Sequence, residues 1–488
     1  MGGVKMANHC GTKTATVAPD HQGTDAADGR PVIRYRLEAS EIEWEIAPGR
    51  TVRGYGFNGQ VPGPVLEAKQ GVPLEIEFTN RLPEPTVIHW HGLRIPAAMD
   101  GTEVVQRPVQ PGETFTYRFT PPDAGTFWYH PHLNETEQLE KGLYGAFIVR
   151  AADELTLDGE KILVLDDLRV DKAGQIAKFG GLMDRHNGRE GNVRLINGTS
   201  EPELTIAAGR IERWRLVNAS SARYVRLSLG GKPFQIIGTD GGLIEAPVTV
   251  SEVLLPAADR VELAVGPFED EGAVLNIEDL PYYRMAGKKG VERFGSIRVT
   301  ARQPSTARVP ARLREIAPLV TGDPTVTRTV TLGVKLSLRR GLDFVVNGER
   351  HHHDQPVNVG ELQVWDVVNA TRMDHPFHLH GFFFQVLEIN GKKPEWRSLE
   401  DVINVTRPHE VQITVLVLDG ESRRSQGLRD GLLAAGDHQT RRPWSLSLAA
   451  RSINDISPRR DRYLARCDSA LSHLLANVVA EAARRATE

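Results

Sequence analysis

The chain has 488 residues, enough for roughly two to four domains with separate hydrophobic cores. Its 59 lysines and arginines nearly balance its 63 aspartates and glutamates, so the net charge of -4 predicts no nucleic-acid partner. No apolar run approaches the ~20 residues of a membrane span. Only two cysteines occur, Cys10 and Cys467, and neither has the spacing of a disulfide framework or a zinc site.

The first 30 residues are polar and lack the apolar segment of a secretory signal, so we expect a disordered arm over residues 1–30. Two interpretations of the location stay open. Either the protein remains in the cytoplasm, or its export signal is missing from this sequence.

One sequence pattern occurs three times. Each copy contains an Asn-Gly turn and, 21 or 22 residues later, an asparagine that closes an alternating strand. The asparagine pairs are Asn58 and Asn80, Asn197 and Asn218, and Asn347 and Asn369. The copies start 139 and 150 residues apart, which is a typical domain size. The pattern therefore predicts three tandem β-sandwich units.

Histidines recur at one position of this repeat. In the first unit His89 and His91 lie nine and eleven residues after Asn80, and in the third unit His378 and His380 lie at the same offsets after Asn369. The second unit has leucines at these offsets. Residues two apart on a strand point to the same face, and neutral imidazole binds copper, zinc, iron and nickel. The repeat therefore predicts a metal site shared by the first and third units, with the second unit as spacer or substrate wall.

Further histidines extend the predicted site. An aromatic-rich strand of the first unit ends in His130 and His132, about 40 residues after the first pair, far enough for the chain to return to a neighbouring strand. His375 precedes His378 but is expected to point elsewhere, because a proline separates it from the strand. Seven histidines exceed the four ligands of one zinc site, which favours more than one metal ion.

These motifs resemble a known family. His-Trp-His-Gly, Trp-Tyr-His-Pro-His and His-Pro-Phe-His-Leu-His-Gly are similar to three of the four copper motifs of three-domain multicopper oxidases, the laccase-like and cuprous-oxidase group. The resemblance covers residues 32–420 and implies an all-β fold of three Greek-key cupredoxin domains. The implied segments are an arm (1–30), domain 1 (31–152), domain 2 without copper ligands (153–302), a linker (303–325), a truncated domain 3 (326–420) and an Arg-rich tail (421–488).

The resemblance also implies residue roles. His89 and His378 would bind a type 2 copper, and His375 would be one ligand of the blue, type 1 copper. Asp100 matches an acidic residue that delivers protons, although an aspartate before glycine is equally typical of a turn. Four of the six type 3 ligands would be His91, His130, His132 and His380.

The fourth motif of the family, His-Cys-His, is missing from this sequence. In the first unit His130 lies 17 residues after Glu113, and the same count from Glu410 in the third unit gives Gly427, where no cysteine or histidine occurs. The type 1 site is therefore expected to be incomplete. From residue 421 the composition changes to twelve arginines and no lysine, as in a shifted reading frame or a genuine replacement tail. Apolar residues in its last part have helical spacing.

The resemblance implies a multicopper oxidase that couples one-electron oxidation of phenolic or aromatic donors, or of cuprous ion, to reduction of dioxygen to water. Loss of the cysteine motif predicts impaired activity, since blue copper needs a thiolate ligand. Two other classes remain: a non-catalytic cupredoxin scaffold or copper-binding protein, and a copper nitrite reductase, whose ligand pattern fits less well. Oligomeric state is left open.

Overall fold

The structure is a computed structural model that describes residues 21–24, 29, 31–103, 105–180, 184, 188–283, 290–322, 325–337, 341–349, 360–407 and 410–416. Cys10, the expected motif position Gly427, and the tail with Cys467 lie outside these ranges. Among the described residues the delimited elements are strands, apart from one short α-helix and one 3-10 turn, which confirms the all-β fold class. No helix in this part is long and apolar enough to cross a bilayer.

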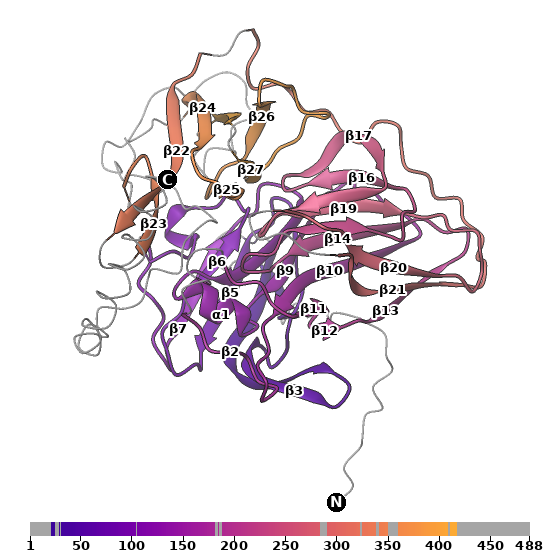
Figure 1. Ribbon diagram of the computed structural model, residues 1–488, viewed down its shortest axis with the longest axis horizontal. Helices are drawn as coiled ribbons and strands as arrows, with labels where there is room; N and C mark the ends of the chain where they lie inside the picture. The colour runs from indigo at the N-terminus through magenta and orange to yellow at the C-terminus, as the bar shows by residue number, and fades with distance from the viewer. Residues whose placement is uncertain are drawn as a thin grey trace, which may run out of the picture. The chain divides into compact units, whose positions relative to one another are not determined.

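The first unit contains two sheets, with strand orders β1-β2-β5-β7 (β3 also pairs with β2) and β4-β9-β8-β6, drawn in indigo and purple in Figure 1. Its elements are β1 (His21–Thr24), β2 (Pro31–Ala47), β3 (Arg50–Phe57), β4 (Leu66–Lys69), β5 (Leu74–Asn80), β6 (Ile88–His91), η1 (Ala97–Met99), β7 (Thr114–Phe119), β8 (Gly125–Pro131), α1 (Glu135–Glu140) and β9 (Gly145–Arg150). Part of the expected disordered arm is instead strand β1. It pairs antiparallel with the start of the long β2, which satisfies backbone groups along that sheet edge.

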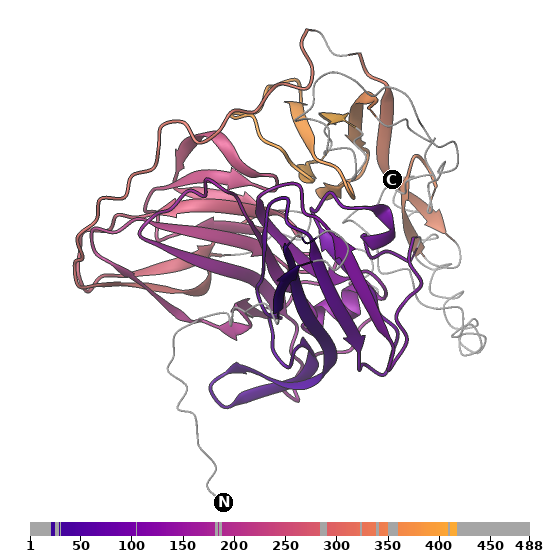
Figure 2. The same cartoon turned by 180° about the vertical axis from the view of Figure 1, so that it is seen from behind.

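The second unit also has two sheets, ordered β12-β11-β10-β14-β19-β16-β17 and β13-β21-β20-β15-β18. Figure 2 shows these strands from behind. Its strands are β10 (Gly159–Leu168), β11 (Val193–Ile196), β12 (Thr199–Ser200), β13 (Glu203–Ala207), β14 (Glu212–Asn218), β15 (Val225–Ser228), β16 (Phe234–Thr239), β17 (Gly242–Val250), β18 (Glu252–Leu255), β19 (Arg260–Val265), β20 (Val274–Asp279) and β21 (Glu292–Thr300).

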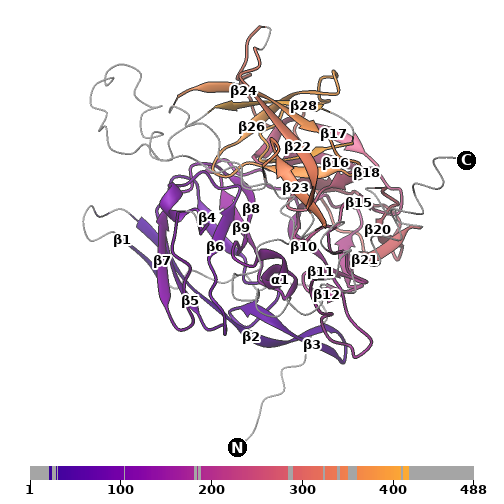
Figure 3. The same ribbon diagram turned by 60° about the vertical axis from the view of Figure 1, so that its left-hand side comes forward.

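The third unit has a five-stranded sheet, β23-β22-β24-β28-β26, and the described part of a second sheet, β25-β27. Figure 3 shows the larger sheet with β22 and β24 labelled. Its strands are β22 (Arg328–Ser337), β23 (Gly341–Val346), β24 (Leu362–Asn369), β25 (His375–His378), β26 (Phe384–Ile389), β27 (Val402–Val405) and β28 (Glu410–Leu416).

The three units share one strand pairing, so the predicted repeat is structural. A parallel pair brings each closing asparagine to the end of its neighbour, with Asn80 opposite Ala39, Asn218 opposite Leu165 and Asn369 opposite Leu332. In each unit the second strand of this pair then pairs antiparallel with β7, β19 or β28. The strands that carry the predicted ligands, β6 and β25, therefore occupy equivalent positions, and β15 is their ligand-free counterpart.

The repeated asparagines have two separate physical roles. At the Asn-Gly turns, asparagine has φ of 50° in all three units and the glycine has φ between 74° and 79°, the backbone that a type I′ hairpin needs. The closing asparagines are buried and hold loop backbone. Asn80 Nδ2, for example, donates to the carbonyls of Glu84 and Val109, at 2.9 and 2.8 Å.

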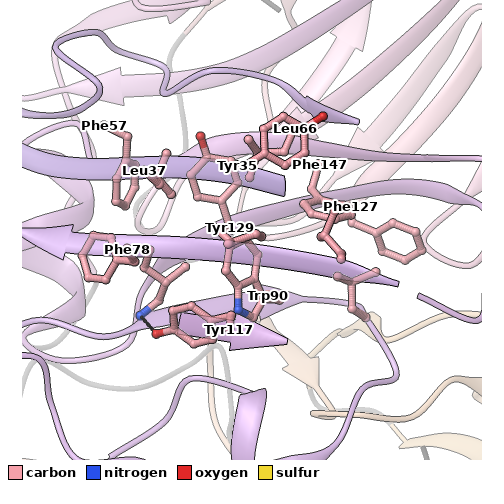
Figure 4. Packing of buried hydrophobic residues seen from close by; sticks show 14 of the residues in the cluster. Tyr35, Leu37, Phe57, Leu66, Phe78, Trp90, Tyr117, Phe127, Tyr129 and Phe147 are labelled. Atoms are coloured by element: carbon pink, nitrogen blue, oxygen red, sulfur yellow. Dashed lines mark hydrogen bonds between the residues drawn. The ribbon is translucent and has the colours of Figure 1, made fainter. Parts of the chain in front are cut away.

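Apolar side chains of both sheets form the core of the first unit. Figure 4 shows Trp90 of β6 between Tyr117 and Tyr129, with ring centroids 5.1 and 5.8 Å away. The Tyr117 hydroxyl accepts a hydrogen bond from the amide of Ile88, at 3.0 Å. Because Trp90 points into this core, its neighbours His89 and His91 must point to the opposite face of β6.

Candidate metal centre

Strand pairing in the first unit sets four histidines close together. In the antiparallel register of β6 and β8, His89 lies opposite His130 and His91 lies opposite Trp128. His132 follows the end of β8, and its ring is 5.6 Å from that of His89. All four are at most 3% exposed. The sequence prediction that the two pairs return to neighbouring strands is therefore met by the geometry.

The third unit adds two histidines, each of which stacks on one from the first unit. The His380 ring lies 4.0 Å from that of His89, and the His378 ring lies 3.8 Å from that of His91. We call these six residues the histidine cluster: His89, His91, His130, His132, His378 and His380. Two triplets of the cluster, His89–His91–His130 and His89–His378–His380, have ligand atoms within 4.8 Å of one another, close enough to hold a metal ion. A third such triplet joins His91 and His378 to Asp401, which lies beside the cluster.

Backbone and carboxylate oxygens fix the orientation of the rings. Nδ1 of His89 lies 2.7 Å from the carbonyl oxygen of Asp100, and Nδ1 of His378 lies 2.9 Å from that of Asp401. A carbonyl only accepts hydrogen bonds, so each Nδ1 carries the proton. The lone pair then resides on Nε2, and both Nε2 atoms are buried without a hydrogen-bond partner.

Ring nitrogens of His91 and His130 also lie close together. His130 donates from Nδ1 to the Pro131 carbonyl at 2.9 Å, so its Nε2 carries a lone pair. That Nε2 lies 3.3 Å from Nδ1 of His91, whose Nε2 lies 3.2 Å from the carboxylate of Asp401. The carboxylate favours the His91 tautomer with its proton on Nε2, in which two lone pairs face each other between the rings; the opposite tautomer donates from Nδ1 to His130 instead. Imidazole lone pairs that converge in a buried site fit a copper ion.

Burial keeps four rings of the cluster in the neutral form that binds metal. Burial, reinforced by neighbouring histidines, lowers the pKa of His89 to about 3 and that of His380 to about 3. Burial likewise holds the pKa of His91 and of His130 well below the ordinary value. At neutral pH these imidazoles therefore have no proton to lose before they bind a cation.

The cluster borders a cavity of about 50 Å³, room for a small ligand such as water or dioxygen. Besides the six histidines, its lining residues are Trp128, Glu135, Leu139, Ser220, Ser221, Ala257 and Ala258. Four of these come from the second unit, which carries no histidine at the repeat position. The prediction of the second unit as a wall is met in this limited sense.

His375 lies apart from the cluster. Its Nε2 is 2.7 Å from the Thr371 hydroxyl, and its ring centroid is 5.6 Å from that of Phe344. His375 points elsewhere, as expected, but Pro376 does not separate it from the strand: β25 begins at His375, and an odd spacing of three residues puts His375 and His378 on opposite faces. The assignment of His375 as a type 1 ligand stays a prediction.

Sequence reasoning missed several residues that contact the cluster. Glu103 approaches His132 at 3.3 Å, Glu135 approaches His130 at 3.5 Å, and Asp401 approaches both His91 and His378. Asp100 was found, through its position after the first motif. Asp401 had no comparable signal, because its stretch has neither a motif nor a histidine nearby.

Three tandem β-sandwich units, with buried histidines of the first and third meeting at one centre, define a copper protein of the cupredoxin type. Multicopper oxidase models match residues 38–154, 127–270 and 325–420. A solved multicopper oxidase from Campylobacter jejuni, described as a metallo-oxidase, is 31% identical with a TM-score of 0.71, over 84% of this chain and 91% of that one. The chain belongs to the multicopper oxidase family.

Two curated relatives show the range of the family. Multicopper oxidase mco of Staphylococcus aureus is 28% identical over 78% of this chain and 82% of its own length. Cell division protein FtsP of Xenorhabdus nematophila is 27% identical over 81% of this chain and 84% of its own length.

Proposed function

We propose that this chain binds copper at the histidine cluster and uses it to reduce dioxygen, with impaired turnover because it lacks a thiolate ligand for blue copper. The observation that carries the proposal is the convergence of buried ring nitrogens: Nε2 of His89 and of His378 has no hydrogen-bond partner, and Nδ1 of His91 lies 3.3 Å from Nε2 of His130. Copper bound there would accept electrons singly and pass them to dioxygen. The chain's own residues hold the ligands, exclude water and keep the rings neutral.

The proposed ligand roles follow the family resemblance. His89 and His378 would hold the type 2 ion, since each has a buried Nε2 with no partner. Type 3 ions would use the remaining four rings of the cluster, His91, His130, His132 and His380. Asp100 is proposed to supply protons, since its carboxylate accepts a hydrogen bond from His380 at 2.9 Å.

Equivalent strands support the proposed loss of the blue site. In the first unit β7 ends at Phe119 and His130 follows eleven residues later. In the third unit Val415 of β28 takes the place of Phe119, since each pairs with the residue six positions before the closing asparagine, and the same count gives Gln426, with no cysteine in between. Without a thiolate, electrons from a donor have no covalent Cys-His route to the cluster.

Donors in the proposed reaction are phenolic or aromatic compounds, or cuprous ion. The sequence has six methionines and no methionine-rich insertion, which favours the organic donors. The similarity to the C. jejuni metallo-oxidase favours a metal-ion donor instead. Comparing oxidation of a phenol with that of cuprous ion would separate the two donor classes.

Copper loading of the purified protein tests the proposal. We expect tight uptake of copper, a type 2 electron paramagnetic resonance signal, no intense blue colour and slow oxygen consumption. His89→Gln should remove uptake at the cluster, whereas His375→Gln, outside the cluster, should retain it. An intense blue colour with fast turnover would contradict the proposed impairment.

A second candidate function is a non-catalytic scaffold. The similarity to FtsP favours it, because that relative is named for cell division rather than for oxidation. The buried, unpartnered Nε2 atoms of His89 and His378 argue against it, since a scaffold gains nothing from unsatisfied polar groups. Failure of the wild-type chain to bind copper would favour the scaffold.

A further inference from the structure

One arginine of the second unit connects all three units beside the cluster. Arg260 is fully buried, and its Nε donates to the carbonyl of Thr126 in the first unit at 3.2 Å. Its Nη1 lies 2.9 Å from Asp240 of its own unit and donates to Asp401 of the third unit at 2.8 Å. Nη2 binds the other carboxylate oxygen of Asp401. Such a bidentate pair fixes both position and plane of the carboxylate.

Asp401 transmits this position to two histidines from different units. Its Oδ1 lies 3.2 Å from His91 Nε2 and 3.3 Å from His378 Nδ1, and its carbonyl accepts from His378 Nδ1 at 2.9 Å. The carboxylate thus sets which nitrogen of His91 carries the proton. The carbonyl does the same for His378.

Asp401 is better placed to orient ligands than to be one. Its distance to His91 and His378 would allow a site of two histidines and one carboxylate. However, Arg260 already binds both of its oxygens. A metal ion at Asp401 would have to compete with a buried guanidinium held by two carboxylates.

Asp240 fixes the backbone on which Asp401 stands. Its Oδ2 accepts from the amides of Asp401 and Val402, at 3.1 and 2.8 Å. Val402 begins β27 and pairs with His378 of β25. Asp240 therefore sets the register at which the third unit presents His378.

We propose that Arg260 and Asp240 are positioning residues through which the ligand-free second unit orients His91 and His378, by way of Asp401. The inference rests on the proposed copper function of the cluster. The second unit then has a role in the metal centre although it has leucines at the two positions where the other units have histidines. Glycine at position 92, in His-Trp-His-Gly, belongs to the same arrangement, because a Cβ there would lie 2.5 Å from Arg260 Nη2.

Arg260→Lys is the main test, because it keeps the positive charge and removes the bidentate geometry. We expect copper affinity, measured by chelator competition, to fall by about tenfold or more, the effect of losing an orienting contact. The type 2 electron paramagnetic resonance spectrum should also change. The control is Arg223→Lys, also in the second unit, which is buried and pairs with Asp167 at 2.7 Å without contacting any residue of the histidine cluster. It should lower thermal stability but leave copper affinity and spectrum unchanged.

Imidazole ¹⁵N NMR of the metal-free protein separates this inference from the copper function. Wild type should show the Nε2 proton on His91 and the Nδ1 proton on His378, and Arg260→Lys or Asp240→Asn should mix the two tautomers. Tautomers that stay unchanged in folded Arg260→Lys, together with unchanged copper affinity, would overturn the inference. If wild type has the expected tautomers, and the variants mix them, but copper does not bind, the copper function fails and the positioning role stands.

Discussion

The ring of His380, in the third unit, donates a hydrogen bond to the carboxylate of Asp100, in the first, with Nδ1 and Oδ2 2.9 Å apart. The carbonyl of the same aspartate accepts from His89 at 2.7 Å. Asp100 thus holds one histidine from the first unit and one from the third, and these two rings stack. Asp401 does the same for His91 and His378. The cluster therefore contains two stacked pairs, each tied across the unit boundary by one aspartate.

This arrangement predicts the effect of Asp100→Asn. The variant retains an acceptor for His380 but loses the negative charge, so we expect copper affinity to fall about tenfold and stability to fall by about 1–3 kcal/mol. Asp279→Asn, a buried carboxylate of the second unit that pairs with Arg223 at 3.6 Å, is the control for stability alone. Equal copper affinity in wild type and Asp100→Asn would contradict the orienting role. A shifted pH–rate profile would support proton delivery.

The equivalent glycines after the two histidine pairs predict contrasting substitutions. Gly92 and Gly381 have φ of 84° and 73°, so alanine at either costs about 1–2 kcal/mol of backbone strain. A Cβ at Gly92 would also lie 2.7 Å from Asp401 Oδ2, whereas none at Gly381 would meet an atom within 4 Å. Gly92→Ala should therefore weaken copper binding and Gly381→Ala should not. Similar copper affinities in the two variants would argue against the close packing of Arg260 and Asp401 on Gly92.

Stability of the metal-free protein should fall as the pH is lowered from 6.5. The pKa of His89 and of His380 is about 3 in the folded chain and ordinarily 6.5, so between these values only the unfolded chain binds the protons. Each such group then costs about 1.4 kcal/mol per pH unit as the pH falls. Urea unfolding at several pH values measures the slope of unfolding free energy against pH. This slope should be smaller in His89→Gln by the contribution of one proton, about 1.4 kcal/mol per pH unit. An unchanged slope in that variant would contradict the buried neutral ring.

The repeat was predictable from the sequence because its causes are local. An Asn-Gly turn needs positive φ, and a closing asparagine binds loop backbone four or five residues on as well as a more distant segment, so the local part of each leaves a fixed spacing. The same counting located His89, His91 and His378 on equivalent strands, and His380 in the turn that follows β25. Sequence alone could also assign Trp90 to the core face, since strand residues alternate.

The contacts that orient the cluster were not predictable in this way. Arg260, Asp240 and Asp401 come from two units and are 20 to 161 residues apart in sequence. Their association depends on how the units pack against each other, and no residue spacing in the sequence indicates that packing. Buried ion pairs also occur in this fold away from the histidine cluster, as Arg213 and Glu262 illustrate at 2.5 Å. Arg260, Asp240 and Asp401 differ from such a pair only in their position beside the histidine cluster.

Glu400, beside Asp401, gives the last prediction. Burial raises its pKa to about 8, and the nearby Asp240 adds to the effect, whereas its ordinary value is 4.5. Between pH 4.5 and 8 the folded chain therefore holds a proton that the unfolded chain has lost, and stability falls as the pH rises, by up to about 1.4 kcal/mol per pH unit. Glu400→Gln, which mimics the protonated acid, should match wild type near pH 4.5 and exceed its stability progressively towards pH 8. Glu262→Gln should behave oppositely at neutral pH. Burial alone would raise the pKa of Glu262, but Arg213 and Arg215 lower it to about 2. The variant removes the fully buried carboxylate that these two cations share, leaves them only Glu154 and Glu160 as partners, and destabilises the fold. Thermal unfolding of both variants across this pH range shows whether each is more or less stable than wild type. If the stability difference between Glu400→Gln and wild type does not grow with pH, the Glu400 carboxyl is ionised in the folded chain.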